Sequence, residues 1–261
     1  MEKGICLISV APLRLSADDR SEMVTQLLFG DQVEILQRKD KWLMVALLDD
    51  GYQGWVSAGQ IAPLSQENSE LLHHSNRFVS TDLVQLLEDK SLNTSFLVSA
   101  GSSFYNCHEG AFELAGKQFH FHGNCRAIAQ PDPSLIPSLA LNFLNTPYLW
   151  GGKSALGIDC SGFTQLVYKM AGFQILRDAS QQATQGQMLN LIHEAAPGDL
   201  LFFDNEEQAI IHVGILLDDE HIIHAHQTVR VDKIDHQGIF NTSLRKYTHK
   251  LRFIKRMYAV D

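Results

Sequence analysis

Three prolines divide the sequence into two parts that have different hydrophobic patterns. Upstream of Pro131, short strand-like runs are separated by turns that contain Gly and Asp, which is typical of an all-β fold. Downstream of Pro137, apolar residues first recur at helical spacing, up to about residue 190, and strand-like runs follow from about residue 199. Helices followed by strands are typical of an α+β domain. The sequence therefore predicts a small all-β part joined to an α+β domain.

The all-β part divides further. The segment Gly-Tyr-Gln-Gly-Trp-Val, residues 51–56, lies among the strand-like runs of the first 64 residues and predicts a small barrel there. A second, degenerate barrel is expected to begin with a short capped helix over 80–87, because Ser80-Thr-Asp precedes an apolar run. We therefore expect a barrel over 1–64, a linker over 65–78, a second barrel over 79–130 and the α+β domain over 131–261.

Composition and charge argue against several classes of protein. The 261 residues include 30 acidic and 21 basic side chains, giving a net charge of −9, and neither half is basic, which argues against nucleic-acid binding. No apolar run approaches the ~20 residues that a membrane-spanning helix requires. The run Ile5–Ala11 ends at Pro12 without a cleavage site, so we interpret it as a strand and expect a cytoplasmic location. Four cysteines are too few for a disulfide-bonded scaffold.

Cys160 has the sequence surroundings of a reactive cysteine. Apolar residues follow it at positions 163, 166, 167 and 170, which is one face of a helix, with Asp159 placed as the N-cap and Gly172 as the C-terminal stop. In the first turn of a helix, the macrodipole and the free N–H groups favour a thiolate over a thiol. The alternative is an ordinary buried cysteine.

A cysteine nucleophile needs an imidazole base, and the base needs a partner that orients it. His212 lies in the strand-like run 210–216, and the turn at 218–220 follows it. The chain then returns with His224 and His226 on one strand face. A hairpin with a short loop places His212 opposite residues 224–226, so strand pairing alone leaves both histidines as candidates for the orienting partner.

A metal site is an alternative use of the cysteines and histidines. One group of candidate ligands consists of Cys107, His108, His120, His122 and Cys125. A second group consists of His221, His224 and His226. The first group lacks the C-x-x-C and H-x₃₋₅-H spacings of zinc sites, and no H-E-x-x-H motif supports the second. We therefore predict that the protein uses neither a metal nor another cofactor.

Five short motifs, in this order along residues 135–258, resemble those of the NlpC/p60 family of papain-like cysteine peptidases. They are Pro147-Tyr148-x-Trp150-Gly151-Gly152, Asp159-Cys160-Ser161-Gly162-Phe163, Pro197-Gly198-Asp199-Leu200, His212-Val213-Gly214-Ile215 and Ile223-His224-Ala225. The resemblance implies Cys160 as the nucleophile, His212 as the base and His224 as the residue that orients the base. His226 then becomes the lesser candidate for that third role.

The upstream part resembles bacterial SH3-like domains, notably over residues 10–14, 21–26 and 51–56. The implied fold is an α+β papain-like catalytic domain preceded by one or two small all-β SH3-like barrels. The whole layout resembles γ-D-glutamyl-L-diamino acid endopeptidases, which cleave murein peptides that have a free N-terminal L-Ala. By this resemblance, substrate contacts are expected from Tyr148, Asp159, Ser161 and Ser180, and contacts to the L-Ala ammonium from Glu22 and Tyr52.

The residues predict a cysteine hydrolase, and the resemblance implies an endopeptidase that hydrolyses the γ-D-glutamyl–diamino acid bond of murein peptides in cell-wall peptide recycling. The expected partners are murein-derived peptides, with no nucleic acid and no membrane. Two alternatives are a catalytically weak wall-peptide-binding protein and an amidase or acyltransferase on the same scaffold. The sequence determines neither the preferred diamino acid nor the oligomeric state.

Overall fold

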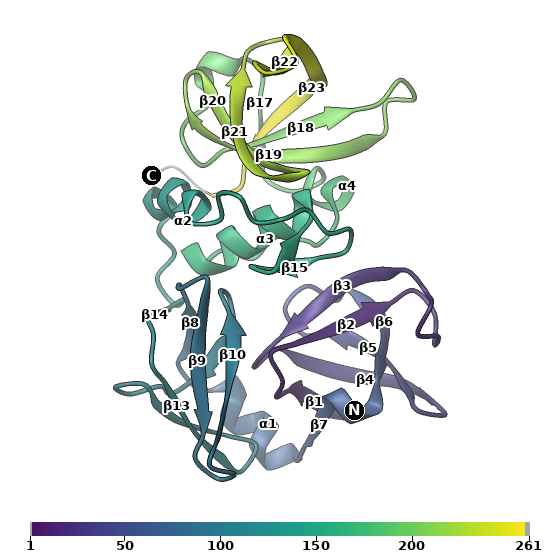
Figure 1. The fold of residues 1–261 in the computed structure, drawn as a ribbon, viewed down its shortest axis with the longest axis vertical. Coiled ribbons are helices and arrows are strands. Elements are labelled where there is room, and N and C mark those ends of the chain that lie inside the picture. The colour runs from purple at the N-terminus through teal and green to yellow at the C-terminus, as the bar shows by residue number, and fades with distance from the viewer. Residues whose placement is uncertain (1, 259–261) are drawn as a thin grey trace. The chain divides into compact units, whose positions relative to one another are not determined.

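The computed structural model describes residues 2–258. It consists of two compact units, and Figure 1 labels many of their elements. The first unit contains the residues up to Gln130 together with Trp150–Leu156, and the second contains Pro131–Leu149 together with the residues from Gly157 onwards. Within the described range, no helix is long and apolar enough to span a membrane.

Residues 3–64 form a seven-stranded antiparallel sheet in the order β3-β2-β6-β5-β4-β1-β7. Buried and less buried residues alternate along β2 and β5, so one face supplies the core, which includes Leu13, Val45 and Val56. At the turn between β5 and β6, Gly51 has a φ of 71°, a backbone conformation that favours glycine. The elements are β1 (Lys3–Cys6), β2 (Val10–Arg14), β3 (Met23–Leu28), β4 (Gln32–Lys39), β5 (Trp42–Leu47), β6 (Gln53–Ser57), η1 (Ala58–Gln60) and β7 (Ile61–Leu64).

The rest of the first unit contains a helix and two small sheets, with strand orders β10-β9-β13-β12 and β11-β8-β14. The elements are α1 (Gln66–His73), β8 (Arg77–Ser80), β9 (Val84–Asp89), β10 (Thr94–Ser99), β11 (Ser103–Tyr105), β12 (Ala111–Leu114), β13 (Lys117–Phe121), β14 (Cys125–Ala127) and β15 (Lys153–Ser154). Helix α1 and the start of β8 therefore occupy the stretch 65–78 that we expected to be a linker.

The helix expected over 80–87 is wrong. Residues 84–89 are strand β9, which pairs with β10 on one side and with β13 on the other. Leu87 is fully buried whereas Leu86 is 45% exposed, so the segment alternates as a strand does. Asp82 accepts a hydrogen bond from the backbone N–H of Asn124 at 2.7 Å, so the polar residues before β9 form a long-range loop contact. Tertiary pairing overrides the local helix signal here.

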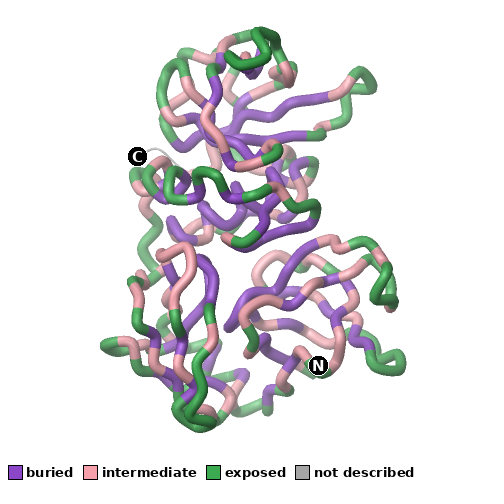
Figure 2. The backbone as a smooth tube through the Cα atoms, viewed as in Figure 1, coloured by how far each residue is buried: buried purple, intermediate pink, exposed green. Residues whose placement is uncertain are grey.

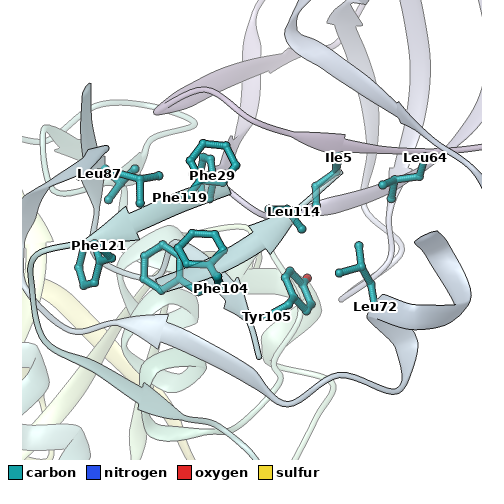
Figure 3. Packing of buried hydrophobic residues seen from close by; sticks show 12 residues of the cluster. Ile5, Phe29, Leu64, Leu72, Leu87, Phe104, Tyr105, Leu114, Phe119 and Phe121 are labelled. Carbon is teal, nitrogen blue, oxygen red and sulfur yellow. The ribbon is translucent and has the colours of Figure 1, made fainter. Parts of the chain in front are cut away.

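Phe29 of the first barrel belongs to the core of the second. It is fully buried, its ring centroid lies 5.2–6.2 Å from phenylalanine rings of the second barrel, and Figure 3 shows it beside Phe119. Next to it, Gly30 has a φ of 80°, and a Cβ there would lie 1.9 Å from the carbonyl oxygen of Ser103. The neighbouring rings are those of Phe96, Phe104, Phe112 and Phe119. The second barrel thus depends on a side chain that lies outside its own sequence.

The second unit consists of short helices and a seven-stranded sheet, within residues 131–258, in the order β17-β23-β18-β19-β20-β21-β22. Strand β22 also pairs with β23, so the sheet closes on itself. Its elements are η2 (Pro133–Leu135), α2 (Ile136–Leu141), β16 (Gly157–Ile158), α3 (Cys160–Ala171), α4 (Ala179–Gln182), β17 (Gln187–Leu189), η3 (Ile192–Glu194), β18 (Leu200–Asp204), β19 (Ile210–Asp218), β20 (His221–His226), β21 (Thr228–Ile234), β22 (Gly238–Asn241) and β23 (Lys246–Arg256).

Strands β18 and β19 form the buried centre of this sheet, and Figure 2 shows them largely in the colour of buried residues. Helix α3 packs against β19 and β20. In the Pro-Gly-Asp-Leu motif before β18, Gly198 has a φ of 98°, and the fully buried Asp199 accepts two hydrogen bonds from Arg256. This motif therefore anchors the start of β18 and lies outside the reactive centre.

Candidate active site

Cys160 is the first residue of α3, as the sequence predicts. Asp159 has an extended backbone and its side chain accepts a hydrogen bond from the N–H of Gly162 at 2.6 Å, which is the N-cap contact. At the other end, Gly172 adopts the left-handed conformation with a φ of 95°. The apolar face of the helix is completely buried, so packing fixes the position of its first turn.

Cys160 is 8% exposed, and its thiol forms hydrogen bonds with the backbone of Val213 on β19 and of Ser161. Burial, with a contribution from the Asp159 carboxylate, raises the pKa of the thiol to about 12, although the two backbone hydrogen bonds and Arg177 act in the opposite direction. The expectation that the helix start favours a thiolate is therefore wrong for the resting structure. Loss of hydration on burial outweighs the two backbone hydrogen bonds that favour the thiolate.

His212 and His224 form a buried hydrogen-bonded pair. His212 Nε2 lies 2.8 Å from His224 Nδ1, and His224 Nε2 lies 3.1 Å from Asp232 Oδ2. Burial holds the pKa of His212 well below its usual value, and repulsion from neighbouring histidines lowers it further. Burial also lowers the pKa of His224, although Asp232 opposes this. Both imidazoles are therefore neutral at pH 7, beside a neutral thiol.

The structure distinguishes His224 from His226. Strand β19 is antiparallel to β20 and Ile215 pairs with Ile223, which places His224 across from Gly214, and a Cβ at Gly214 would lie only 2.9 Å from the Cβ of His224. Glycine at this position therefore gives the His224 ring room to reach His212. The ring centroid of His226 lies 6.5 Å from that of His212, and no hydrogen bond between these two described residues accompanies the contact.

A buried ion pair lies behind the nucleophile. Arg177 is 1% exposed, and its guanidinium donates to both carboxylate oxygens of Asp159, at 3.1 and 2.7 Å, and to Ser161 Oγ at 2.9 Å. Asp159 and Ser161, which we expected to contact substrate, are 6% exposed and bonded within this network. The network fixes the first turn of α3 from inside the protein.

Tyr148 and Ser180 belong to the second unit, as this network does. The backbone of Tyr148 bridges to Ile158, and burial together with the nearby Cys160 and Asp159 raises the pKa of its hydroxyl to about 12. At neutral pH the hydroxyl is therefore a hydrogen-bond donor beside the nucleophile. Ser180 is exposed on α4, and the same helix is joined to the start of α3 because Gln182 donates to the carbonyl of Ser161 at 3.0 Å.

Comparisons with known proteins show the family of the chain. Residues 145–248 match the model of the NlpC/P60 family, and residues 13–61 match that of the bacterial dipeptidyl-peptidase Sh3 domain. A gamma-D-glutamyl-L-lysine dipeptidyl-peptidase of Bacillus subtilis (strain 168) is 30% identical over 221 residues, which is 78% of this chain and 72% of the relative. The chain belongs to the NlpC/P60 family.

Two further relatives extend the similarity along the chain. Dipeptidyl-peptidase 6 of Lysinibacillus sphaericus is 25% identical over 259 residues and covers 90% of this chain and 92% of its own. The crystal structure of an NlpC/P60 family protein from Bacillus cereus ATCC 10987 has the same fold, with a TM-score of 0.83 at 22% identity over 98% of this chain and 99% of that one. The predicted α+β papain-like domain preceded by SH3-like all-β structure is confirmed, and the protein is a cysteine peptidase.

The first unit of this NlpC/P60 protein contains the other two expected site residues. Glu22 is exposed, and its Oε1 accepts a hydrogen bond from Trp150 Nε1 at 2.6 Å. The segment that carries Trp150 is held in this unit because the Lys153 N–H donates to Gln26 Oε1 at 2.8 Å. Tyr52 is half-buried against the core of the first barrel.

Among the described residues, no group of three or more His, Cys, Asp or Glu side chains could hold a metal ion. This applies to the region from Cys107 to Cys125. Cys107 and Cys125 are instead hydrogen-bonded to each other, which lowers the pKa of Cys125 to about 7 and raises that of Cys107. The His120 and His122 rings lie 4.7 Å apart, and His122 pairs with Glu88 at 3.3 Å. These residues belong to the second barrel and are separate from the Cys160 site.

The sequence reasoning missed Asp232, Arg177 and His249. The ring of His249 on β23 stacks on His212 with a centroid distance of 4.3 Å. Strand alternation could have identified Asp232, because Arg230 pairs with His224 and Asp232 follows two residues later on the same face. Nothing in the local sequence around Arg177 or His249 indicates where their side chains lie.

Proposed function

We propose that this protein is an endopeptidase for the bond between the γ-carboxyl of D-Glu and the amine of the next L-diamino acid in murein peptides that have a free N-terminal L-Ala. The activity named for the Bacillus subtilis relative supports the bond, because it is a gamma-D-glutamyl-L-lysine dipeptidyl-peptidase. The observation that carries the proposal is Cys160 at the start of a buried, capped helix, beside β19, the strand that carries His212, which is hydrogen-bonded to His224 on β20.

The nucleophile is activated as the substrate is attacked. His212 Nε2 is engaged with His224, so Nδ1 is the ring nitrogen available to take the thiol proton. As Cys160 Sγ attacks the γ-carbonyl carbon, this proton moves to His212, and the resulting imidazolium then gives it to the departing amine. Water hydrolyses the thioester, with His212 again as the base, and releases the L-Ala-γ-D-Glu dipeptide.

Two groups are placed to stabilise the oxyanion. The backbone N–H of Cys160 lies at the positive end of α3. The Tyr148 hydroxyl stays protonated because its pKa is raised to about 12, so it can donate a second hydrogen bond. Ser180 on the exposed side of α4 is the remaining substrate contact in this proposal.

Recognition of the peptide end is assigned to the first barrel. A free ammonium needs a carboxylate, and Glu22 offers one that is oriented by the indole N–H of Trp150. The Tyr52 hydroxyl is the second group proposed to contact the ammonium. In intact wall the L-Ala amine is acylated, so this requirement selects released peptides and fits murein-peptide recycling in the cytoplasm.

The test compares L-Ala-γ-D-Glu-L-Lys with its N-acetylated form. A charge-assisted contact contributes about 1.5–3 kcal/mol, so acetylation should lower kcat/KM at least about tenfold in the wild type. In Glu22→Gln the same acetylation should have a much smaller effect, because the charge partner is absent. Glu67→Gln, an exposed change in the same unit, is the matched control and should keep the wild-type discrimination.

Efficient cleavage of the acetylated peptide by the wild type would contradict the assignment of Glu22. Peptide binding without turnover would instead identify a wall-peptide-binding protein. Replacing L-Lys with meso-diaminopimelate in the same assay determines which diamino acid is preferred.

A further inference from the structure

Asp232 is a buried carboxylate that the reaction described above does not use. It lies on β21 and is 4% exposed. Its Oδ2 is 3.1 Å from His224 Nε2, and its Oδ1 accepts a hydrogen bond from Arg230 Nη2 at 2.8 Å. Burial by itself raises the pKa of Asp232, but the hydrogen bonds from His224 and Arg230 bring it below its usual value. At neutral pH this carboxylate is therefore ionised and can only accept hydrogen bonds.

We propose that Asp232, held in place by Arg230, is a positioning residue that selects the ring nitrogen of His212 that receives the thiol proton. This inference rests on the proposed cysteine-peptidase reaction and deepens it. Asp232 touches neither the thiol nor the substrate in this scheme, and it acts only through His224.

The selection follows from hydrogen-bond donors and acceptors. Because Asp232 can only accept, the neutral His224 carries its proton on Nε2, which leaves Nδ1 as an acceptor. His212 must then donate from Nε2 across the 2.8 Å contact, so its own Nδ1 has the free lone pair. That nitrogen is the one left to face the thiol. One fixed charge on β21 therefore determines the proton positions on two histidines.

Two variants make this selection testable. Asp232→Leu has a similar volume but no acceptor, so nothing holds the His224 proton on Nε2. In Asp232→Asn, the amide has one accepting oxygen and one donating nitrogen. Arg230 Nε lies 2.7 Å from Oδ2, which also faces His224, whereas Oδ1 accepts from Nη2 alone. The amide oxygen is therefore expected at the Oδ2 position, where it still accepts a hydrogen bond from His224.

Asp232→Leu should therefore lower kcat by about a hundredfold or more, as a wrong tautomer does in a serine-peptidase triad, with little change in KM. Asp232→Asn should recover at least about tenfold of that loss, because its amide oxygen replaces the acceptor that faces His224. A role for the negative charge alone predicts instead that Asp232→Asn is as inactive as Asp232→Leu.

Asp218→Asn is the matched control. Asp218 and His221 form another Asp–His pair, 2.8 Å apart, but this pair is exposed at the turn of the β19–β20 hairpin. The control should retain wild-type kcat and KM.

The ring-nitrogen tautomers supply a readout that needs neither substrate nor turnover. NMR of protein carrying ¹⁵N-labelled histidine should show Nε2–H on both His212 and His224 in the wild type. In Asp232→Leu, Nδ1–H should appear on both, whereas Asp232→Asn should keep Nε2–H. This measurement tests the role of Asp232 separately from the proposed substrate. If the enzyme has these tautomers but fails to cleave γ-D-glutamyl peptides, only the substrate assignment is refuted.

Three results would each overturn the role of Asp232. The first is Nδ1–H on His212 or His224 in the wild type, which can be measured even if the variants do not fold. The second is a kcat for Asp232→Leu within threefold of wild type, or a larger loss with unchanged tautomers. The third is an Asp232→Asn variant that is as inactive as Asp232→Leu.

Discussion

Replacing Arg177 with methionine tests what the buried ion pair behind the nucleophile contributes. The guanidinium is 1% exposed and makes bonds of 2.7 and 3.1 Å to the Asp159 carboxylate, which is itself 6% exposed. Methionine has a similar length but no charge, so Arg177→Met leaves this carboxylate buried without its cation. Loss of one partner of a buried ion pair typically costs about 3–5 kcal/mol in the free energy of unfolding. We expect a loss in that range, measured by urea denaturation at pH 7.

The double variant Arg177→Met/Asp159→Asn separates the interaction energy of the ion pair from the effects of each substitution on packing. Asp159→Asn alone leaves Arg177 charged and buried, whereas the double variant removes both charges. The double variant should therefore lose less than the sum of the two single variants, by about 1–3 kcal/mol.

Arg38→Met is the control, because its ion pair with Glu2 is about half exposed at both side chains and should contribute no more than about 1 kcal/mol. An Arg177→Met loss below about 1 kcal/mol, or strict additivity in the cycle, would refute the reasoning.

Three other properties are predicted. Phe29→Ala removes the ring that joins the two barrel cores and should destabilise the first unit by about 3–5 kcal/mol in thermal or urea unfolding, whereas Leu97→Ala, at a 51% exposed position, should change it by no more than about 0.5 kcal/mol. Alkylation of Cys160 by iodoacetamide in the resting enzyme should still be accelerating above pH 9, because burial raises the thiol pKa to about 12, and a plateau below pH 7 would indicate a preformed thiolate instead.

The third property concerns His249. Burial and the facing His224 and His226 lower its pKa to about 4, although Asp232 acts in the opposite direction. The unfolded chain, with an ordinary histidine pKa of about 6.5, binds the proton first as the pH falls, so stability should decline between pH 6.5 and 4. His249→Phe should flatten this decline in urea titrations at pH 7 and pH 5, and an unchanged slope would contradict the assignment. His212 and His224 contribute in the same direction, so some slope should persist.

The parts of the fold that the sequence predicts correctly are those set by local chemistry. The helix from Cys160 to Ala171 has a cap, a stop and an apolar face, and all three signals agree. The helix expected over 80–87 is wrong because only a cap and a short apolar run support it, while pairing with β10 and β13 comes from distant residues. The role of Phe29 in the second barrel is equally non-local, since 67 residues separate it from Phe96.

The site shows the same division. Alternation along β19 and β20 limits the partner of His212 to two histidines, and only the side-chain geometry selects His224. The pKa of Cys160 could not be obtained from its place at a helix start, because the depth of burial depends on packing against β19. Asp232 was within reach of the sequence, since alternation places it with Arg230 on the strand face that pairs with His224.

Product mass spectrometry tests the central claim most directly. Wild-type protein and Cys160→Ala are each incubated with L-Ala-γ-D-Glu-L-Lys-D-Ala, and the released fragments are identified. We expect the wild type to produce L-Ala-γ-D-Glu and L-Lys-D-Ala, and Cys160→Ala, which loses little packing at the helix start, to remain folded and release neither. Cleavage at another bond would contradict the proposed specificity. Equal release of the two dipeptides by Cys160→Ala would contradict the cysteine mechanism itself.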